Sequence, residues 1–98
     1  MKVNFDYKVP NGKLLRLNIN FSDNKIKEIK LCGDFFMHPE EAVSDIENSL
    51  IGSAIEKDSI IKKVSEVVKE KNAALFGINA EAIADAIIAA HGRCEDGK

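Results

Sequence analysis

The sequence predicts an α+β fold in which a three-stranded antiparallel meander is followed by three helices packed on the sheet. Apolar and polar residues alternate through the first third of the chain, which is the pattern of strands with one buried face. After Gly33 the apolar residues recur every three or four positions, as in amphipathic helices. No helical segment separates the three strands, so short turns connect them and we expect an antiparallel sheet.

The strands are delimited by turn residues. Asn11-Gly12 and the segment Ser22-Asp23-Asn24 are typical of tight turns. The first two strands each direct one set of apolar side chains inward, namely Val3, Phe5, Tyr7 and Val9, then Leu15, Leu17, Ile19 and Phe21. In the third strand, about residues 25–32, Ile26 is out of phase with Ile29 and Leu31. This irregularity predicts a β-bulge or an end effect.

Three helices are expected in the remainder of the chain. The first opens at Pro39-Glu40-Glu41, because proline and acidic residues suit a first turn, and stops at Gly52. The second covers about residues 58–71 with Asp58 or Ser59 as its cap, and the third follows Asn79, a good N-cap residue. We therefore expect a single domain over residues 1–91 and a flexible tail over residues 92–98.

Composition and charge exclude several classes of protein. The net charge is −2, which argues against a nucleic-acid partner. No apolar run approaches the roughly 18 residues of a membrane span, and the chain starts with a strand pattern instead of a signal-peptide core, so we expect a cytoplasmic protein. Residues 1–37 carry seven Lys/Arg and four Asp/Glu, against seven and twelve in the remainder, so the sheet half is mildly basic.

The junction between the third strand and the first helix carries two adjacent aromatics in the run Gly33-Asp34-Phe35-Phe36. Junctions of this kind normally contain small polar residues, so both phenylalanines need apolar cover, either in the core or on another protein. Asp34 is positioned to accept backbone N–H bonds and hold the turn. The same stretch groups the reactive side chains of the chain.

That group contains Cys32, Asp34, His38, Glu40 and Glu41. A thiol with a nearby histidine is one way to build a nucleophile, but Cys32 lies in a strand and His38 directly precedes a proline. One histidine with two glutamates matches no metal-ligand spacing, Cys32 and Cys94 are expected to be reduced thiols, and the glycines form no phosphate-binding loop. We predict no catalytic residue and no metal site.

Several segments together resemble a known family. They are Tyr7-Lys8-Val9-Pro10, Gly12-Lys13-Leu14-Leu15-Arg16, Gly33-Asp34-Phe35-Phe36, His38-Pro39-Glu40-Glu41 and Leu50-Ile51-Gly52. Over about residues 5–90 the chain resembles the accessory, C-terminal-type domain of lipoate-protein ligases. It is most similar to the archaeal arrangement, in which this domain is a separate small subunit.

The resemblance implies a fold similar to iron–sulfur scaffold and sulfur-acceptor proteins, and a heterodimer with a large catalytic subunit. It implies that ATP, magnesium and lipoate bind to that partner and none to this chain, which lacks the Arg-Arg-x-Ser-Gly-Gly-Gly type of lipoate-binding sequence. In the family the small subunit is required to form lipoyl-AMP, and lipoyl-acceptor domains are served indirectly. Phe35 and Phe36 are then candidate anchors for the partner, with Lys13 or Arg16 at the rim and Gly33, Asp34 and Pro39 shaping the turn.

Two alternatives use the reactive residues. The likeness to sulfur acceptors suggests that Cys32 carries a persulfide or binds a cluster in sulfur delivery. A stand-alone hydrolase using Cys32 and His38 is the third hypothesis, and it predicts turnover by the purified chain without a partner.

Overall fold

A computed structural model describes residues 2–10 and 12–96, with the side chains of residues 93–96 outside the description. The elements in chain order are β1 (Lys2–Lys8), β2 (Leu14–Ser22), β3 (Lys25–Gly33), β4 (Phe36–His38), α1 (Glu41–Leu50), α2 (Lys57–Lys71), β5 (Ala74–Phe76) and α3 (Ala80–Asp96). Strands β1, β2 and β3 form an antiparallel sheet in that order, and β4 pairs with β5 in a separate two-stranded ribbon. The predicted α+β class and meander are confirmed.

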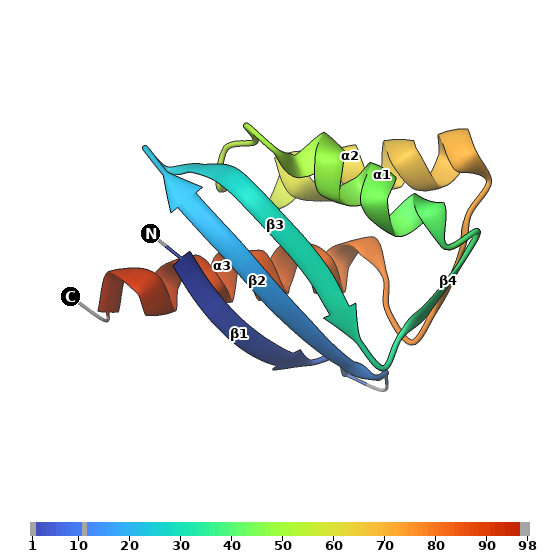
Figure 1. The fold of residues 1–98 in the computed structure, drawn as a ribbon, viewed down its shortest axis with the longest axis horizontal. Helices are drawn as coiled ribbons and strands as arrows, with labels where there is room; N and C mark the ends of the chain where they lie inside the picture. The colour runs from blue at the N-terminus through green and yellow to red at the C-terminus, as the bar shows by residue number, and fades with distance from the viewer. Residues whose placement is uncertain (1, 11, 97–98) are drawn as a thin grey trace.

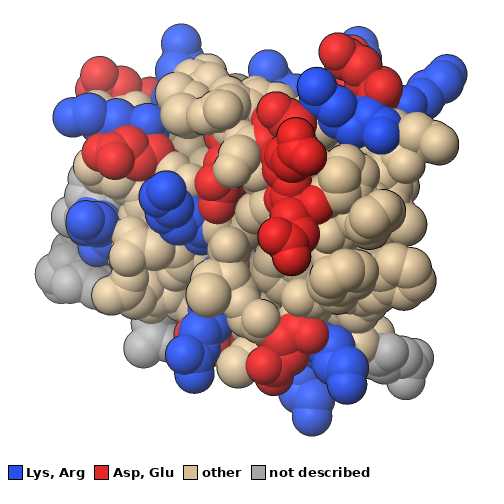
Figure 2. Space-filling view, turned by 45° about the vertical axis from the view of Figure 1, so that its right-hand side comes forward, with Lys and Arg blue, Asp and Glu red and all other residues tan. Residues whose placement is uncertain are grey.

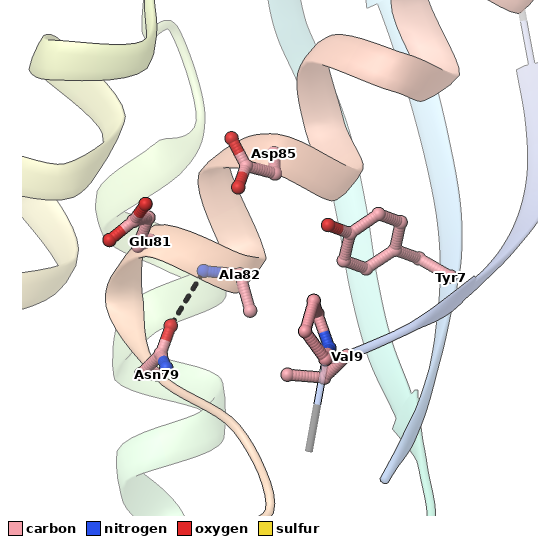
Figure 3. A pocket seen from close by; sticks show the side chains of 7 residues that line it. Tyr7, Val9, Asn79, Glu81, Ala82 and Asp85 are labelled. Carbon is pink, nitrogen blue, oxygen red and sulfur yellow. Dashed lines mark hydrogen bonds between the residues drawn. The ribbon is translucent and has the colours of Figure 1, made fainter. Parts of the chain in front are cut away.

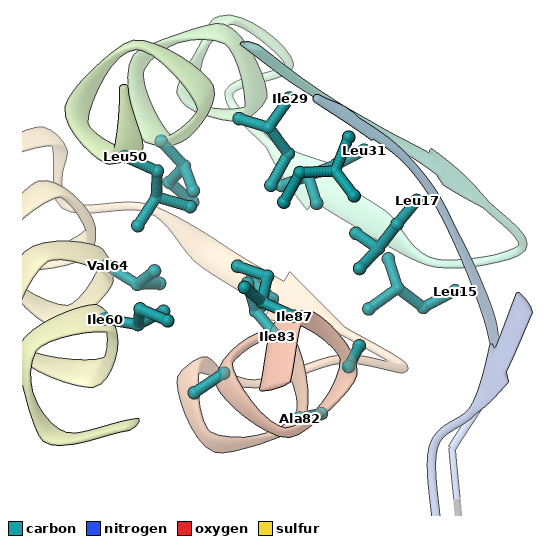
Figure 4. Close-up of a cluster of buried hydrophobic side chains, with 14 of the residues drawn as sticks. Leu15, Leu17, Ile29, Leu31, Leu50, Ile60, Val64, Ala82, Ile83 and Ile87 are labelled. Atoms are coloured by element: carbon teal, nitrogen blue, oxygen red, sulfur yellow. The ribbon is translucent and has the colours of Figure 1, made fainter. Parts of the chain in front are cut away.

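The helices cover one face of the three-stranded sheet and leave the other open (Figure 1). Helix α3 lies against β1 and β2, while α1 lies against β3. The sequence predicted that all three helices pack on the sheet. Helix α2 instead packs on α1 and α3 and forms an outer layer. The core between these layers contains Leu15 and Leu17 from the sheet and Ile60, Ile83 and Ile87 from the helices (Figure 4).

A β-bulge explains the irregular pattern of the third strand. Asn20 pairs with Glu28 and the next residue, Phe21, pairs with Ile26, so Lys27 is the extra residue. The extra residue reverses the alternation and turns Ile26 to the same buried face as Ile29. The bulge predicted from the sequence is therefore confirmed.

Tight turns connect the three strands of the meander. Asp23 and Asn24 connect β2 to β3 with φ angles of 52° and 60°, the signature of a type I′ turn. In the first hairpin the N–H of Gly12 donates to the carbonyl of Val9. Asn11, the other half of the predicted turn, lies outside the described residues.

Strand β3 is an edge of the sheet, and other segments cover it. The N–H of Leu31 donates to Oε2 of Glu47 in α1 at 2.7 Å. Near the other end of β3, Ile26 exchanges backbone hydrogen bonds with the loop after α1, accepting from Gly52 and donating to Ser53. These contacts occupy outward backbone groups at two points of this edge and so protect it.

The start of α1 differs from the prediction. Phe36–His38 forms strand β4, the His38–Pro39 peptide bond is cis, and Glu40 is the N-cap, so Pro39 lies before the helix and not in its first turn. The end is as expected, because Gly52 has a φ of 83°, which glycine adopts readily.

Helix α2 begins one residue earlier than predicted, at Lys57, and its N-cap Glu56 makes no side-chain cap bond. Asp58 and Ser59 therefore lie in the first turn, and their prediction as caps is wrong. Burial of Ile60 and Val64 fixes the position of this helix, and tertiary packing of this kind outweighs capping preferences.

Helix α3 has the predicted cap and extends further along the chain than the sequence predicted. Asn79 caps the helix, since its Oδ1 accepts the N–H of Ala82 at 2.7 Å. The helix continues through Gly92 to Asp96, where the sequence predicted a flexible tail. A single glycine costs a helix only about 1 kcal/mol, and His91 packs edge-on against Phe21 with ring centroids 5.0 Å apart. Residues 97 and 98 lie outside the described residues.

Within the described part of the chain, no helix combines the length and the apolar character that crossing a bilayer requires.

Gly33 is the residue of the fold least able to accept a side chain. Its φ is +138°, and a methyl group there would overlap the carbonyl oxygen of Leu14. We expect Gly33→Ala to lower the free energy of unfolding by about 3 kcal/mol or more in urea denaturation. Gly52→Ala is the matched control, because Gly52 also has a positive φ, +83°, but a methyl group there would have no atom within 4 Å. This variant should lower the free energy of unfolding by about 1–2 kcal/mol. Equal losses would contradict the role given to the Leu14 contact.

Candidate partner-binding surface

The β4–β5 ribbon carries the largest exposed aromatic side chains of the described residues. Phe36 on β4 pairs directly with Phe76 on β5. Their side chains are 50% and 55% exposed, and the ring centroids lie 5.8 Å apart at 37°. Met37 and Leu75 point the opposite way, into the core, because alternate residues of a strand face opposite sides. The ribbon thus holds an outward aromatic pair on a buried base.

Local backbone geometry brings the two short strands together. Gly33 ends β3, and the N–H of Asp34 donates to the carbonyl of Leu14, which fixes the exit of the chain toward β4. On the other side, α2 ends at Lys71, and its C-cap residue Asn72 is in the left-handed conformation, with φ of 52°. The N–H of Ala73 then donates to Val68, a C-terminal cap that turns the chain into β5.

Lys13 flanks this ribbon. Its backbone N–H donates to the carbonyl of Gly77 at 3.0 Å, and its side chain covers Gly77 so closely that a methyl group there would lie 2.5 Å from Cγ. Gly77 follows Phe76 in the chain, so Lys13 contacts the residue directly after the ribbon. Figure 2 turns the β4 side of the molecule forward and shows charges of both signs around uncharged surface, with acidic groups gathered near the centre.

The structure separates the residues that the sequence grouped as interface candidates. Phe35 is half-buried against the core, whereas Phe36 is exposed and contacts Phe76, the residue before Gly77. Arg16 lies on the open face of the sheet, where its Nε is 3.6 Å from a carboxylate oxygen of Asp6. Lys13 therefore lies next to the end of the ribbon, whereas Arg16 belongs to the open face of the sheet.

The turn residues act mainly through their backbones. Gly33 has the positive φ described above, and Asp34 bonds through its N–H while its carboxylate remains exposed. The expected side-chain hydrogen bonds of Asp34 are absent among the described residues. Pro39 contributes its carbonyl, which accepts the N–H of Ala42 at the start of α1.

The reactive residues do not converge on one site. Cys32 is exposed on the open face of the sheet, opposite Arg16 in register, and lines a hollow of about 370 Å³. His38 lies on the ribbon, exposed and opposite Ala74. Among the described residues, no hydrogen bond joins Cys32 to His38, and no group of three His, Cys, Asp or Glu side chains is arranged to hold a metal ion. The side chain of Cys94 lies outside the described residues.

A shallow cleft of about 190 Å³ separates the end of β1 from the first turns of α3 (Figure 3). Tyr7 and Val9 line one side, and Ala82 and Asp85 line the other. Nζ of Lys57 lies 2.9 Å from Asp85, and this hydrogen bond, with the carboxylate charge, raises the pKa of Lys57. Asp85 is therefore engaged in an ion pair that joins α2 to α3.

Phe76 is the surface residue that sequence reasoning missed. Residues 73–76 read Ala-Ala-Leu-Phe, a short apolar run between two helices and directly before Gly77. Such a run indicates a short strand when glycine follows it. A strand of three residues is too short to display alternation, and its partner strand β4 is distant in the sequence, since Met37 pairs with Leu75.

The exposure of the aromatic pair predicts a sharp contrast in stability. We expect Phe36→Ala and Phe76→Ala each to change the free energy of unfolding by less than about 1 kcal/mol, as for exposed sites. Met37→Ala is the matched control on the same strand, and its buried side chain should cost about 2–5 kcal/mol. Chemical denaturation measures all three, and a core-like loss at Phe36 or Phe76 would show that the pair supports the fold.

Three comparisons relate the chain to known proteins. Residues 1–87 match the family model described as bacterial lipoate protein ligase C-terminus. A curated relative, lipoate-protein ligase A subunit 2 of Thermoplasma acidophilum, is 46% identical over 44 residues, which are 45% of this chain and 47% of the relative. The matched segment thus spans about half of that relative's length.

The chain is also similar to a solved structure from Thermoplasma acidophilum, described as a bi-partite lipoate protein ligase and its E2 lipoyl domain. The TM-score is 0.73 at 31% sequence identity, and the match covers 89% of this chain and 94% of the other.

Proposed function

Because the chain belongs to the family of bacterial lipoate protein ligase C-termini, we propose that it is the non-catalytic small subunit of a two-chain lipoate-protein ligase. The observation that carries the proposal is the structural likeness, over nearly the full length of both chains, to a chain of an archaeal bi-partite ligase. The name subunit 2 of the curated relative supports the same assignment.

In this proposal the chain acts together with a large catalytic subunit, in the cytoplasm, in the ATP-dependent activation of lipoate to lipoyl-AMP. ATP, magnesium and lipoate bind to the large subunit, which also serves the lipoyl-acceptor domains. This chain contributes binding energy and no catalytic group. Docking selects the state of the large subunit whose adenylate-binding loops are ordered, so activation depends on the complex.

The aromatic pair is the anchor of the proposed contact. Phe36 and Phe76 are each about half exposed, and burial of aromatic surface dominates the energetics of protein interfaces. Their base on Met37 and Leu75 holds the rings in place before binding, so little conformational freedom is lost. Lys13 lies at the rim, where a charge affects association rate and specificity more than affinity.

The anchor is tested by affinity measurements on the two-chain complex. Phe36→Ala and Phe76→Ala should each weaken binding of the large subunit at least about tenfold in titration calorimetry, because each removes an aromatic side chain from the contact. Ile51→Ala is the matched control, since Ile51 is also 50% exposed but lies at the end of α1. Equal effects of all three variants would refute the aromatic pair as the anchor.

The activity is tested by co-purification with the large subunit, followed by lipoate- and ATP-dependent pyrophosphate release. We expect release with both chains and little with either chain alone. Cys32→Ser should leave this activity unchanged, because its thiol lies on the open sheet face and outside the proposed anchor. Adenylation that is equally fast without the small chain would overturn the proposal, and a persulfide on Cys32 after exposure to a cysteine desulfurase would favour the sulfur-acceptor alternative.

A further inference from the structure

The two edges of the three-stranded sheet are treated differently by the rest of the molecule. The β3 edge is covered, because Glu47 accepts the N–H of Leu31 and the loop after α1 pairs with Ile26. No described residue hydrogen-bonds to the outer side of β1, and no segment lies along it in Figure 1. The sheet thus has one closed edge and one open edge.

The hydrogen-bond alternation identifies which groups face outward from β1. The N–H of Val9 donates to Lys13, which places the odd-numbered residues of β1 in hydrogen-bonded pairs with β2. The even-numbered residues, among them Asn4 and Asp6, therefore direct their N–H and C=O groups to the open edge. The same alternation applies to β3. Leu17 bonds to Phe5 of β1, so the N–H of Leu31, opposite Leu17 on the other side, points away from β2 and donates to Glu47.

Strand β1 carries a lysine at each end but lacks two other devices that protect an open edge, a bulge and a proline. Its seven residues pair with β2 without a register shift, and it contains neither a bulge nor a proline. Its inward side chains Val3, Phe5 and Tyr7 are only half-buried, although they pack against the core. An added strand would pair with the outward backbone groups and extend the apolar face over these three side chains.

A second copy of the chain is a poor occupant of this edge. Antiparallel pairing of β1 with itself over its full length is centred on Phe5 and sets Lys2 opposite Lys8 at both ends. Like charges directly opposite on a sheet destabilise the pairing. The shifted register that sets Lys2 opposite Asp6 pairs only five residues. The lysines thus disfavour self-association of the edge.

The large subunit of the proposed ligase is the better occupant for two reasons. The matched family is a ligase C-terminus and the match includes β1, so in one-chain members the rest of the ligase lies on the N-terminal side of β1. Strand β1 also runs into the loop whose Lys13 contacts Gly77, next to Phe76, so this edge is continuous with the proposed anchor.

We infer that the open edge of β1 accepts an extended segment of the large subunit, which adds a fourth strand to the sheet across the interface. The inference rests on the proposed function. The segment that fits has acidic residues opposite Lys2 and Lys8, and apolar residues on the face next to Phe5 and Tyr7.

Amide hydrogen exchange of the isotope-labelled chain, followed by NMR, tests the added strand. In the free chain the amides of Asn4 and Asp6 should exchange quickly, while those of Phe5 and Tyr7 are protected by β2. In the complex, exchange at Asn4 and Asp6 should slow at least tenfold. A complex that co-elutes without this protection overturns the edge inference and leaves the proposed function standing, whereas failure to form a complex overturns both.

Charge variants give a second readout that leaves the backbone intact. The double change Lys2→Glu and Lys8→Glu should weaken binding of the large subunit at least tenfold, with a circular dichroism spectrum like that of the original chain. Lys62→Glu with Lys69→Glu is the matched control, since these lysines lie on the exposed face of α2. Equal affinities for the two double variants would contradict a strand with acidic residues at the β1 edge.

Discussion

The close contact between Gly33 and Leu14 determines where the chain goes after the three-stranded sheet. Gly33 adopts a φ of +138° with no side chain to meet the Leu14 carbonyl, and the next N–H, from Asp34, donates to that same oxygen. The chain leaves the sheet in a fixed direction and forms β4 before α1 begins. As a consequence Phe35 turns toward the core and Phe36 toward solvent, so neighbouring identical residues have different environments.

The sequence predicted the parts of the fold in which local pattern and tertiary packing agree. The meander, the bulge near Ile26 and the Asn79 cap each have a signal within a few residues, and each was confirmed. The only local signal of the β4–β5 ribbon is the short apolar run before Gly77, and it does not reveal the pairing, because each strand has three residues and the two segments are distant in the sequence. Phe76, one of the two residues of the exposed aromatic pair, was therefore identified only from the structure. The start of α2 was misplaced because buried isoleucine and valine, and not a cap, position that helix.

The ribbon combines exposure with rigidity. Phe36 and Phe76 cover part of each other, which lowers the cost of leaving both in water, while Met37 on the same strand is buried. The backbone at both ends is restrained, by Asp34 on one side and by the cap at Asn72 on the other. A surface of this kind loses little conformational entropy on binding, whereas the same aromatic side chains on a flexible loop would have to be ordered first.

The aromatic pair alone is too small to hold two proteins together. A specific interface buries about 800 Å² on each partner, and two half-exposed phenylalanines supply on the order of 200 Å². The proposed contact must extend over neighbouring surface, and the loop at Lys13 is continuous with both the ribbon and β1. An added strand along β1 would contribute backbone hydrogen bonds and cover three half-buried side chains. Backbone pairing is tolerant of side-chain identity, so specificity in such an arrangement falls to the aromatic pair and to the charges at the ends of β1.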